Sequence, residues 1–310
     1  MEYRALGNTG MRLSAISYGA SSLGGVFHPF QELEGIKSVV AAVENGINFI
    51  DVSPYYGHLQ AEIVLGKALK EIAREKYYLS TKVGRYGKDG VNQWDYSAGK
   101  AVASVYESME RLHVDYIDLI NVHDIEFADL EKVCKETLPA LVELRAKGIV
   151  RHVGITNLTL RHLKYVVDHV QAGTVESVLS FCHYCLNDDA LIDYFDYFDS
   201  KNVGIINASP FAMGLLTERG APDWHPAPAP LRKLCAQAAA YCKSKGKSIE
   251  QLAVKYAVSN PRITTTLFST TRPEAVLQNI HRANEPLDEE LLEEVRHILE
   301  PRFRDTWLNS

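Results

Sequence analysis

The sequence predicts an α/β protein whose strands close into a (β/α)₈ TIM barrel, with its active site at the C-terminal face of the strands. Short apolar runs, about eight in all, alternate with amphipathic segments, and each run ends in polar residues. The rival is a doubly wound open sheet, which usually carries a G-x-G-x-x-G turn after its first strand when it binds dinucleotides. Gly19, Gly24 and Gly25 do not have that spacing. No linker divides the chain, so we predict a single barrel domain over residues 1–310.

The strands of this barrel are expected at the apolar runs. In chain order the runs are LSAISYGAS, NFIDVS, YYLSTKV, YIDLINVHD, VRHVGITN, SVLSFCHY, VGIINASP and TTTLFSTT. Between the last two lies the only proline-rich piece, residues 221–230, which we interpret as one long loop. Barrel strands direct their C-terminal ends toward a single site, so the polar residues after each run are candidates for function.

Helices are expected where apolar residues recur at the helical period. One such stripe, spaced by four, three, four and three, consists of Ala98, Val102, Val105, Met109 and Leu112. An earlier helix ends before Asn45-Gly46, a favourable C-cap. A later one begins at Pro273, which suits a first turn. Asp288 is expected to cap the last helix.

Composition excludes several functional classes. The 310 residues are 46% hydrophobic and 23% charged, with a net charge of -6, and no basic patch suited to nucleic acid is present. No apolar window approaches the roughly 18 residues of a membrane span, and the N-terminus lacks a secretion signal pattern. The five scattered cysteines fit reduced thiols. We therefore expect a cytoplasmic protein, a monomer or small homo-oligomer, with no membrane or nucleic-acid partner.

A metal site is not expected. Cys182 and Cys185 form a C-x-x-C motif, but a structural zinc site usually needs a second pair, which the sequence lacks. The motif also falls in a predicted strand, whose alternation would point the two cysteines to opposite faces.

Four ionisable side chains fall at or just after neighbouring predicted strand ends: Asp51, Tyr56, Lys82 and His123. Each alone also fits a structural role, such as a turn residue, a solvated strand end or a core histidine. Their coincidence at one barrel face favours a catalytic site instead. Asp51 would hold Lys82, and the lysine charge would lower the pKa of the Tyr56 phenol, making it a general acid/base. With no metal or nucleophile evident, the matching chemistry is hydride transfer with a nicotinamide cofactor.

The sequence resembles the aldo-keto reductase family from end to end. The resemblance is carried by GINFIDVSPYYG, STKVG, SMERLHVDYIDLINVHD, KGIVRHVGITN and SPFAMGLL. It implies that Asp51, Tyr56, Lys82 and His123 form the catalytic tetrad, with tyrosine as general acid/base. It also implies a barrel that binds NAD(P) extended across its C-terminal mouth.

Cofactor-binding residues are carried over from the same resemblance. Thr156 and Asn157 match the pair that holds the nicotinamide carboxamide. The expected pyrophosphate segment comprises Ser209, Phe211, Gly214 and Leu215, and the expected adenosine segment comprises Ser269, Thr270, Arg272, Gln278 and Asn279. Departures from the family pattern are Phe181 and Ala208 near the nicotinamide. Ser269 and Ala275 stand where NADP users often have basic residues, so the resemblance favours NAD.

The activity implied by the resemblance is NAD-dependent oxidation of a sugar, L-galactose, at C1 to L-galactono-1,4-lactone, as in ascorbate biosynthesis. Loops over the mouth are expected to contact the sugar through Tyr55, His123, Trp94, Phe27 and His28. Each of these could equally be an ordinary loop anchor. Two alternatives remain open: an NADPH-dependent aldehyde or ketone reductase of the same fold, and a non-catalytic module that senses nicotinamide.

Overall fold

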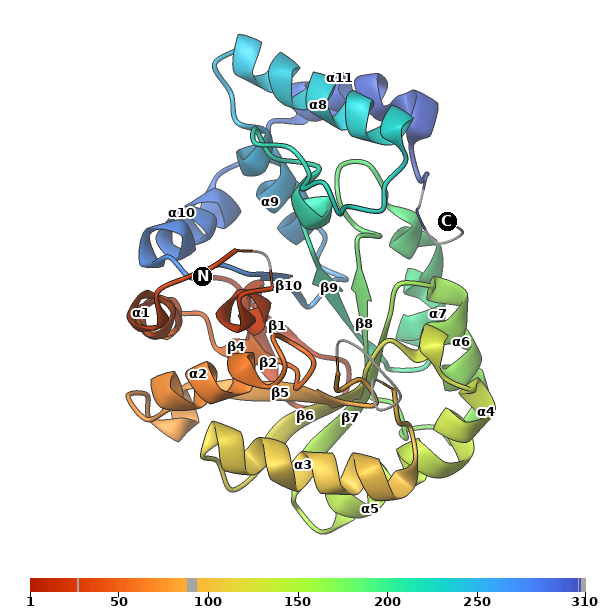
Figure 1. The fold of residues 1–310 in the computed structure, drawn as a ribbon. Helices are drawn as coiled ribbons and strands as arrows, with labels where there is room; N and C mark the ends of the chain where they lie inside the picture. The colour runs from red at the N-terminus through yellow and green to blue at the C-terminus, as the bar shows by residue number, and fades with distance from the viewer. Residues whose placement is uncertain (27, 88–93, 306, 308–310) are drawn as a thin grey trace.

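A computed structural model describes residues 1–26, 28–87, 94–305 and 307. Eight parallel strands form a closed barrel in the order β10-β3-β4-β5-β6-β7-β8-β9, which confirms the predicted fold class (Figure 1). The strands are β3 (Ile16–Gly19), β4 (Phe49–Asp51), β5 (Tyr78–Val83), β6 (Ile117–Val122), β7 (Val150–Asn157), β8 (Ser177–Phe181), β9 (Gly204–Ala208) and β10 (Thr265–Phe268). Parallel strands joined by helices on the outside are the arrangement that buries both faces of the sheet.

The helices surround this barrel (Figure 1). They are α1 (Glu32–Glu44), α2 (Gln60–Leu69), α3 (Ala98–Leu112), α4 (Leu130–Lys132), α5 (Leu138–Ala146), α6 (Leu160–His169), α7 (Phe195–Ser200), α8 (Ala229–Ser244), α9 (Ile249–Ser259), α10 (Pro273–Asn284) and α11 (Glu289–Leu299). Helices α8 and α11 pack against each other and form a layer beside the ring. The Asp288 carboxylate accepts a hydrogen bond from Leu291 N at 3.1 Å, so the expected cap of the last helix is confirmed.

The N-terminal end of the barrel is closed by a short antiparallel pair, β1 (Tyr3–Ala5) and β2 (Arg12–Ser14). Its turn carries Leu6 and Met11, which are buried in one cluster with Phe49 and Leu119 from the barrel. The sequence pattern does not predict this plug, because the run LSAISYGAS is typical of a single strand. It divides into the end of β2 and the barrel strand β3.

Two local predictions are wrong. The proline-rich loop ends sooner than expected, because α8 begins at Ala229 with a proline in its first turn, where proline needs no backbone partner. Strand β8 ends at Phe181, so the C-x-x-C motif lies outside it, and Cys182 has a left-handed φ of 63°. Both cysteines are buried free thiols, and Cys185 Sγ donates to Cys182 O at 3.4 Å.

No helix in the described part of the chain combines the length and the apolar character needed to cross a membrane.

Candidate active site

The C-terminal ends of the barrel strands open into a cleft of about 1100 Å³. All eight strands reach it or lead directly into residues that do. Asp51, Tyr56, Lys82 and His123 line it together, so the four side chains singled out in the sequence do meet in one place. Within residues 1–26, 28–87, 94–305 and 307, no three His, Cys, Asp or Glu side chains form a group that could hold a metal ion.

Asp51 and Lys82 form a buried ion pair at the floor of the cleft. Their side chains are only 4% and 2% exposed. The Lys82 ammonium donates to the Asp51 carboxylate and to Val52 O, the latter at 2.7 Å. Ser80 Oγ donates to the other carboxylate oxygen at 2.8 Å. Burial alone would lower the pKa of Lys82, but the Asp51 charge outweighs it and the pKa is raised, so the lysine remains a cation.

Tyr56 lies beside this pair, with its ring centroid 5.0 Å from Lys82 Nζ. An ammonium has three protons, and two of those on Lys82 go to Asp51 and Val52, which leaves the third for the phenol oxygen. The position of Tyr56 is fixed by close backbone contact. A Cβ added to Gly24 would lie 2.6 Å from the Tyr56 carbonyl oxygen, so only glycine allows the 3-10 segment Ala20–Gly24 to pack there.

The expected lowering of the Tyr56 pKa is not found. Burial raises the pKa of Tyr56 and outweighs the opposing effect of the Lys82 charge, while the charges of Asp51 and Asp124 raise it further. The prediction fails because burial removes water from the phenol, an effect that the spacing of residues in the sequence does not reveal. In this structure the phenol is therefore a proton donor at neutral pH.

His123 follows the last residue of β6 and packs edge-on against Tyr56, with ring centroids 5.8 Å apart. Burial holds the pKa of His123 well below 6.5, and the charges of Lys82 and Arg85 lower it further, so the imidazole is neutral. Its Nδ1 lies 3.1 Å from Ser53 Oγ, and its Nε2 lies 3.5 Å from an oxygen of Asp124.

These contacts assign the tautomer of His123. Ser53 Oγ already accepts a hydrogen bond from Tyr55 N at 3.1 Å, and its own proton can be donated to Nδ1. The proton of the imidazole then resides on Nε2, facing the Asp124 carboxylate and the cleft. The opposite tautomer would place a lone pair against that carboxylate. Ser53 thus orients the histidine as a hydrogen-bond donor.

A second ion pair lies farther out along the same wall. Arg85 Nη1 donates to Asp124 Oδ2 at 2.5 Å, and the two side chains are 19% and 7% exposed. The guanidinium also stacks on Tyr55, with its carbon 3.6 Å from the ring centroid, and on Trp94 at 4.4 Å. Trp94 in turn stacks on Phe127 at 4.1 Å. This cation–aromatic stack fixes Arg85 at the rim.

The rest of the cleft runs between the loops that follow β9 and β10. Left-handed backbone is concentrated in the first loop, where φ is 63° at Ser209, 45° at Ala212, 53° at Met213 and 107° at Gly214. Strained backbone of this kind is characteristic of ligand clamps. The second loop leads into α10 at Pro273, and the N-terminus of a helix attracts anions.

Comparison with known proteins identifies the family. The model described as aldo/keto reductase family matches residues 15–300. The chain belongs to the aldo/keto reductase family. It is 46% identical to L-galactose dehydrogenase of Arabidopsis thaliana, over 99% of this chain and 97% of that protein. It is 33% identical to D-arabinose 1-dehydrogenase of Saccharomyces cerevisiae, over 70% of this chain and 67% of that protein.

Solved structures show the same fold. An aldo-keto reductase from Bacillus halodurans superposes with a TM-score of 0.79 at 24% identity, over 96% of both chains. A glycerol dehydrogenase from Gluconobacter oxydans gives 0.77 at 20% identity, over 98% of this chain and 97% of that one. Membership of the family makes this chain an oxidoreductase, and the family uses a nicotinamide cofactor.

Most residues that the resemblance pointed to for this cofactor line the cleft: Thr156, Ser209, Phe211, Gly214, Ser269, Thr270, Arg272, Gln278 and Asn279. Phe181, Ala208 and Ala275 line it as well. Hydroxyls, amides and arginine beside a helix N-terminus suit an anionic dinucleotide, so the residues present fit the group.

Two predicted cofactor residues do not line the cleft. Asn157 uses its side chain within the neighbouring loops, accepting from Glu126 N at 2.9 Å and donating to Thr159 O at 3.1 Å. Leu215 is buried in the hydrophobic core, 2% exposed. A strand-end position in the sequence does not reveal which way a side chain turns.

Only some of the predicted substrate residues line the cleft. Tyr55, His28 and His123 line the cleft. Trp94 does not line it but packs behind Arg85 in the rim stack, and Phe27 lies outside the described residues. Sequence reasoning missed Ser53, which contacts His123, and it missed Arg85, Asp124 and Arg282, which line the cleft. The HD pair at 123–124 is a local signal for Asp124, which directly follows His123.

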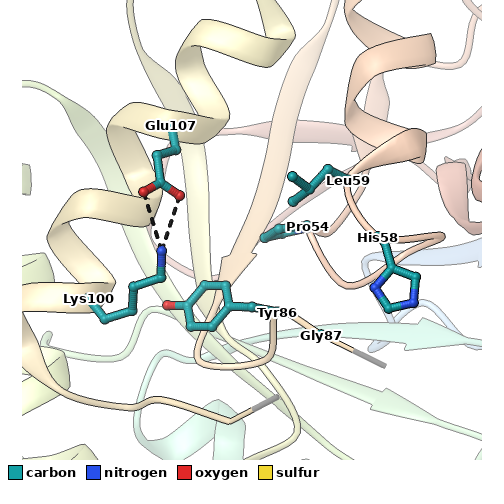
Figure 2. Close-up of a pocket in the computed structure, with 7 residues that line it drawn as sticks. All are labelled: Pro54, His58, Leu59, Tyr86, Gly87, Lys100 and Glu107. Atoms are coloured by element: carbon teal, nitrogen blue, oxygen red, sulfur yellow. Dashed lines mark hydrogen bonds and ion pairs between the residues drawn. The ribbon is translucent and has the colours of Figure 1, made fainter. Parts of the chain in front are cut away.

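A smaller hollow of about 290 Å³ lies beside the mouth (Figure 2). Its lining residues are Pro54, His58, Leu59, Tyr86, Gly87, Lys100 and Glu107. Lys100 donates to both oxygens of Glu107, at 3.3 and 3.2 Å. None of the four strand-end residues lines it, so the large cleft is the candidate active site.

Proposed function

We propose that this protein is an NAD-dependent sugar dehydrogenase that oxidises L-galactose at C1 to its lactone, the reaction expected of a step in ascorbate biosynthesis. The observation that carries the proposal is the buried Asp51–Lys82 pair beside Tyr56, in a cleft that His123 also lines. The relative named L-galactose dehydrogenase supports the substrate, since the 46% identity extends over nearly the whole of both chains. A second relative at 33% identity is also named for an aldose dehydrogenase.

The proposed roles follow from the geometry. Tyr56 would accept the proton of the C1 hydroxyl, and Lys82 would stabilise the phenolate that this requires, since it remains charged beside Asp51. The Nε2–H of His123 would donate to the same sugar oxygen and orient it. Bound nicotinamide supplies the acceptor for the hydride that leaves C1.

Residues of the two loops would hold that nicotinamide cofactor. Thr156 would lie on the nicotinamide half, Ser209 beside the pyrophosphate, and Arg272 and Asn279 on the adenosine half. The preference for NAD rests on Ser269 and Ala275, which offer no charge to a 2′-phosphate.

A second candidate function, reduction of an aldehyde or ketone with NADPH, is favoured by two observations. Arg219 and Arg282 line the cleft in addition to Arg272, which increases the positive charge available to a phosphate. The raised pKa of Tyr56 keeps the phenol protonated, as a reductase needs its proton donor to be.

The deciding experiment is a panel of aldoses with NAD and with NADP, followed at the nicotinamide absorbance. The proposal predicts the highest kcat/KM for L-galactose with NAD. Because oxidation needs the phenolate, its rate should also rise with pH into the alkaline range. Preferred turnover of aldehydes with NADPH would support the second candidate instead. Cofactor binding without turnover of any aldose or aldehyde would reject both enzyme functions and favour the non-catalytic module that senses nicotinamide.

A further inference from the structure

Asp124 occupies an unusual position for a carboxylate. It lines the cleft yet is only 5% exposed, and its backbone is left-handed, with φ of 46°. Two neighbours fix that backbone: Thr156 Oγ1 accepts from Asp124 N at 3.1 Å, and Tyr96 OH donates to Asp124 O at 2.9 Å. A strained residue held by its surroundings on the wall of a site is a candidate for function.

The carboxylate of Asp124 is aimed at the reacting region. One of its oxygens, Oδ2, is 3.5 Å from His123 Nε2, the nitrogen assigned to contact the reacting oxygen of the substrate. Arg85 Nη1 donates to this same oxygen. Burial raises the pKa of Asp124, and the Arg85 charge opposes this effect. The two carboxylate oxygens offer about four acceptor positions, so Asp124 retains capacity for a ligand.

Arg85 is likewise placed to serve a ligand. Its guanidinium is held flat by Tyr55 and Trp94, and it lines the cleft beside Asp124. Its Nε is buried without a hydrogen-bond partner in the described part of the chain. Because one edge of the guanidinium is paired and the plane is fixed by stacking, the remaining N–H groups point in set directions.

We propose that Asp124 and Arg85 form a subsite that binds the hydroxyl on the carbon next to the reacting one, which is the C2 hydroxyl of an aldose. This inference rests on the proposed function and deepens it by assigning substrate selection to this pair. Vicinal hydroxyl oxygens lie roughly one hydrogen-bond length apart. A sugar whose C1 oxygen contacts His123 Nε2 therefore presents its C2 hydroxyl to Asp124. The carboxylate accepts a hydrogen bond from this hydroxyl, and Arg85 donates one to its oxygen.

The subsite makes a prediction about substrates that lack this hydroxyl. Binding the neighbouring carbon without a hydroxyl would leave a desolvated carboxylate facing a C–H group, which is unfavourable. The enzyme should therefore prefer L-galactose over 2-deoxy-L-galactose by about 10- to 100-fold in kcat/KM, the range for a hydrogen bond to a charged group. Loss of a more distant hydroxyl, as in 6-deoxy-L-galactose, should leave the contact between the C2 hydroxyl and Asp124 unchanged.

The test compares Asp124→Asn with the wild-type enzyme on these three sugars. Asparagine tolerates a left-handed backbone and has nearly the same shape, so the fold should be kept. We expect kcat/KM to fall about 10- to 100-fold for L-galactose and its 6-deoxy analogue, and by less than about 3-fold for the 2-deoxy sugar. An equal fall for all three, or no fall for any, would overturn the subsite.

Glu126→Gln provides the matched control. Glu126 is the neighbouring half-buried carboxyl group, with its pKa raised to about 8 by burial, and it does not line the cleft. Its replacement should leave the ratio of activities on L-galactose and 2-deoxy-L-galactose unchanged. If it changes that ratio as much as Asp124→Asn does, the effect is not specific to Asp124 and the subsite is wrong.

Failure of the proposed function would be recognised separately. If the wild-type enzyme oxidises no aldose, the dehydrogenase proposal fails, and the same comparison is run in reduction with glyceraldehyde, which has a 2-hydroxyl, and propanal, which lacks one. The subsite then predicts that Asp124→Asn loses activity on glyceraldehyde and keeps it on propanal. Equal effects on the two aldehydes, or no turnover of either, would reject it.

Discussion

Two carboxylate–cation pairs line the same cleft, and they are built differently. The inner pair, Asp51–Lys82, is almost fully buried, and Ser80 and Val52 O supply further hydrogen bonds to it. The outer pair, Asp124–Arg85, is more exposed at the arginine and is supported by stacked aromatic rings rather than by a closed hydrogen-bond network. The contrast suggests that the inner pair fixes a charge beside Tyr56, whereas the outer pair retains hydrogen-bonding capacity for a ligand.

The largest expected effect tests whether the inner pair acts through Tyr56. Tyr56→Phe removes the hydroxyl that would exchange the proton, so kcat should fall by roughly 10²- to 10⁴-fold, the usual contribution of a general acid/base. Cofactor affinity, measured by fluorescence titration, should stay near the wild-type value. Tyr55→Phe is the neighbouring control and should lose far less. Wild-type turnover in Tyr56→Phe would remove the basis for the assigned mechanism.

The stabilities of two conservative variants would sharpen the comparison between the pairs. Asp51→Asn leaves Lys82 buried without a counter-charge and should lower the free energy of unfolding by roughly 3–5 kcal/mol. Asp124→Asn should cost only about 1 kcal/mol, since Arg85 keeps its aromatic partners and some contact with water. Urea denaturation measures both. Similar losses for the two variants would mean that the pairs are equally structural.

A third prediction concerns protonation of the imidazole that lies between the two pairs. His123 is held neutral, so between roughly pH 6.5 and pH 5 the unfolded chain takes up a proton that the folded protein does not. The free energy of unfolding should therefore decrease as pH falls through this window, by up to about 1.4 kcal/mol per pH unit from this group.

The variant His123→Asn isolates this contribution. His162 and His225 also have lowered pKa values, but they are present in both proteins, so their effect cancels in the difference. Denaturant titrations across the window should give a shallower pH dependence for the variant. Identical slopes would show that folding does not lower the pKa of His123.

The smallest expected effect concerns Ser53, which links His123 to the Tyr55 loop. Ser53→Ala removes the donor to Nδ1 and should reduce kcat about 3- to 10-fold, the value of one ordinary hydrogen bond. The ¹⁵N chemical shifts of the His123 ring should then show loss of the pure Nε2–H tautomer. Ser53→Thr keeps the hydroxyl and should restore both properties. An unchanged tautomer in Ser53→Ala would refute the assignment.

The sequence was sufficient for the parts of the site that local pattern controls. Asp51 and Lys82 lie in short apolar strands, and a barrel aims such strand ends at a common centre. It was insufficient for Asn157, whose amide turns into the adjoining loops, and for Leu215, which enters the core. Both outcomes depend on loops whose path no local pattern specifies.

The sequence by itself determined the alternation of strands and helices, the family, and the identity of the four residues gathered in the cleft. Only the tertiary structure decided their protonation and their partners. The pKa of Tyr56 is raised because burial outweighs the Lys82 charge, a balance that no spacing along the chain expresses. Arg85 and Asp124 are 39 residues apart in the sequence and form an ion pair only in the folded chain. Folding sets both the distances between charges and the amount of water around them, and these two quantities determine the protonation of each group.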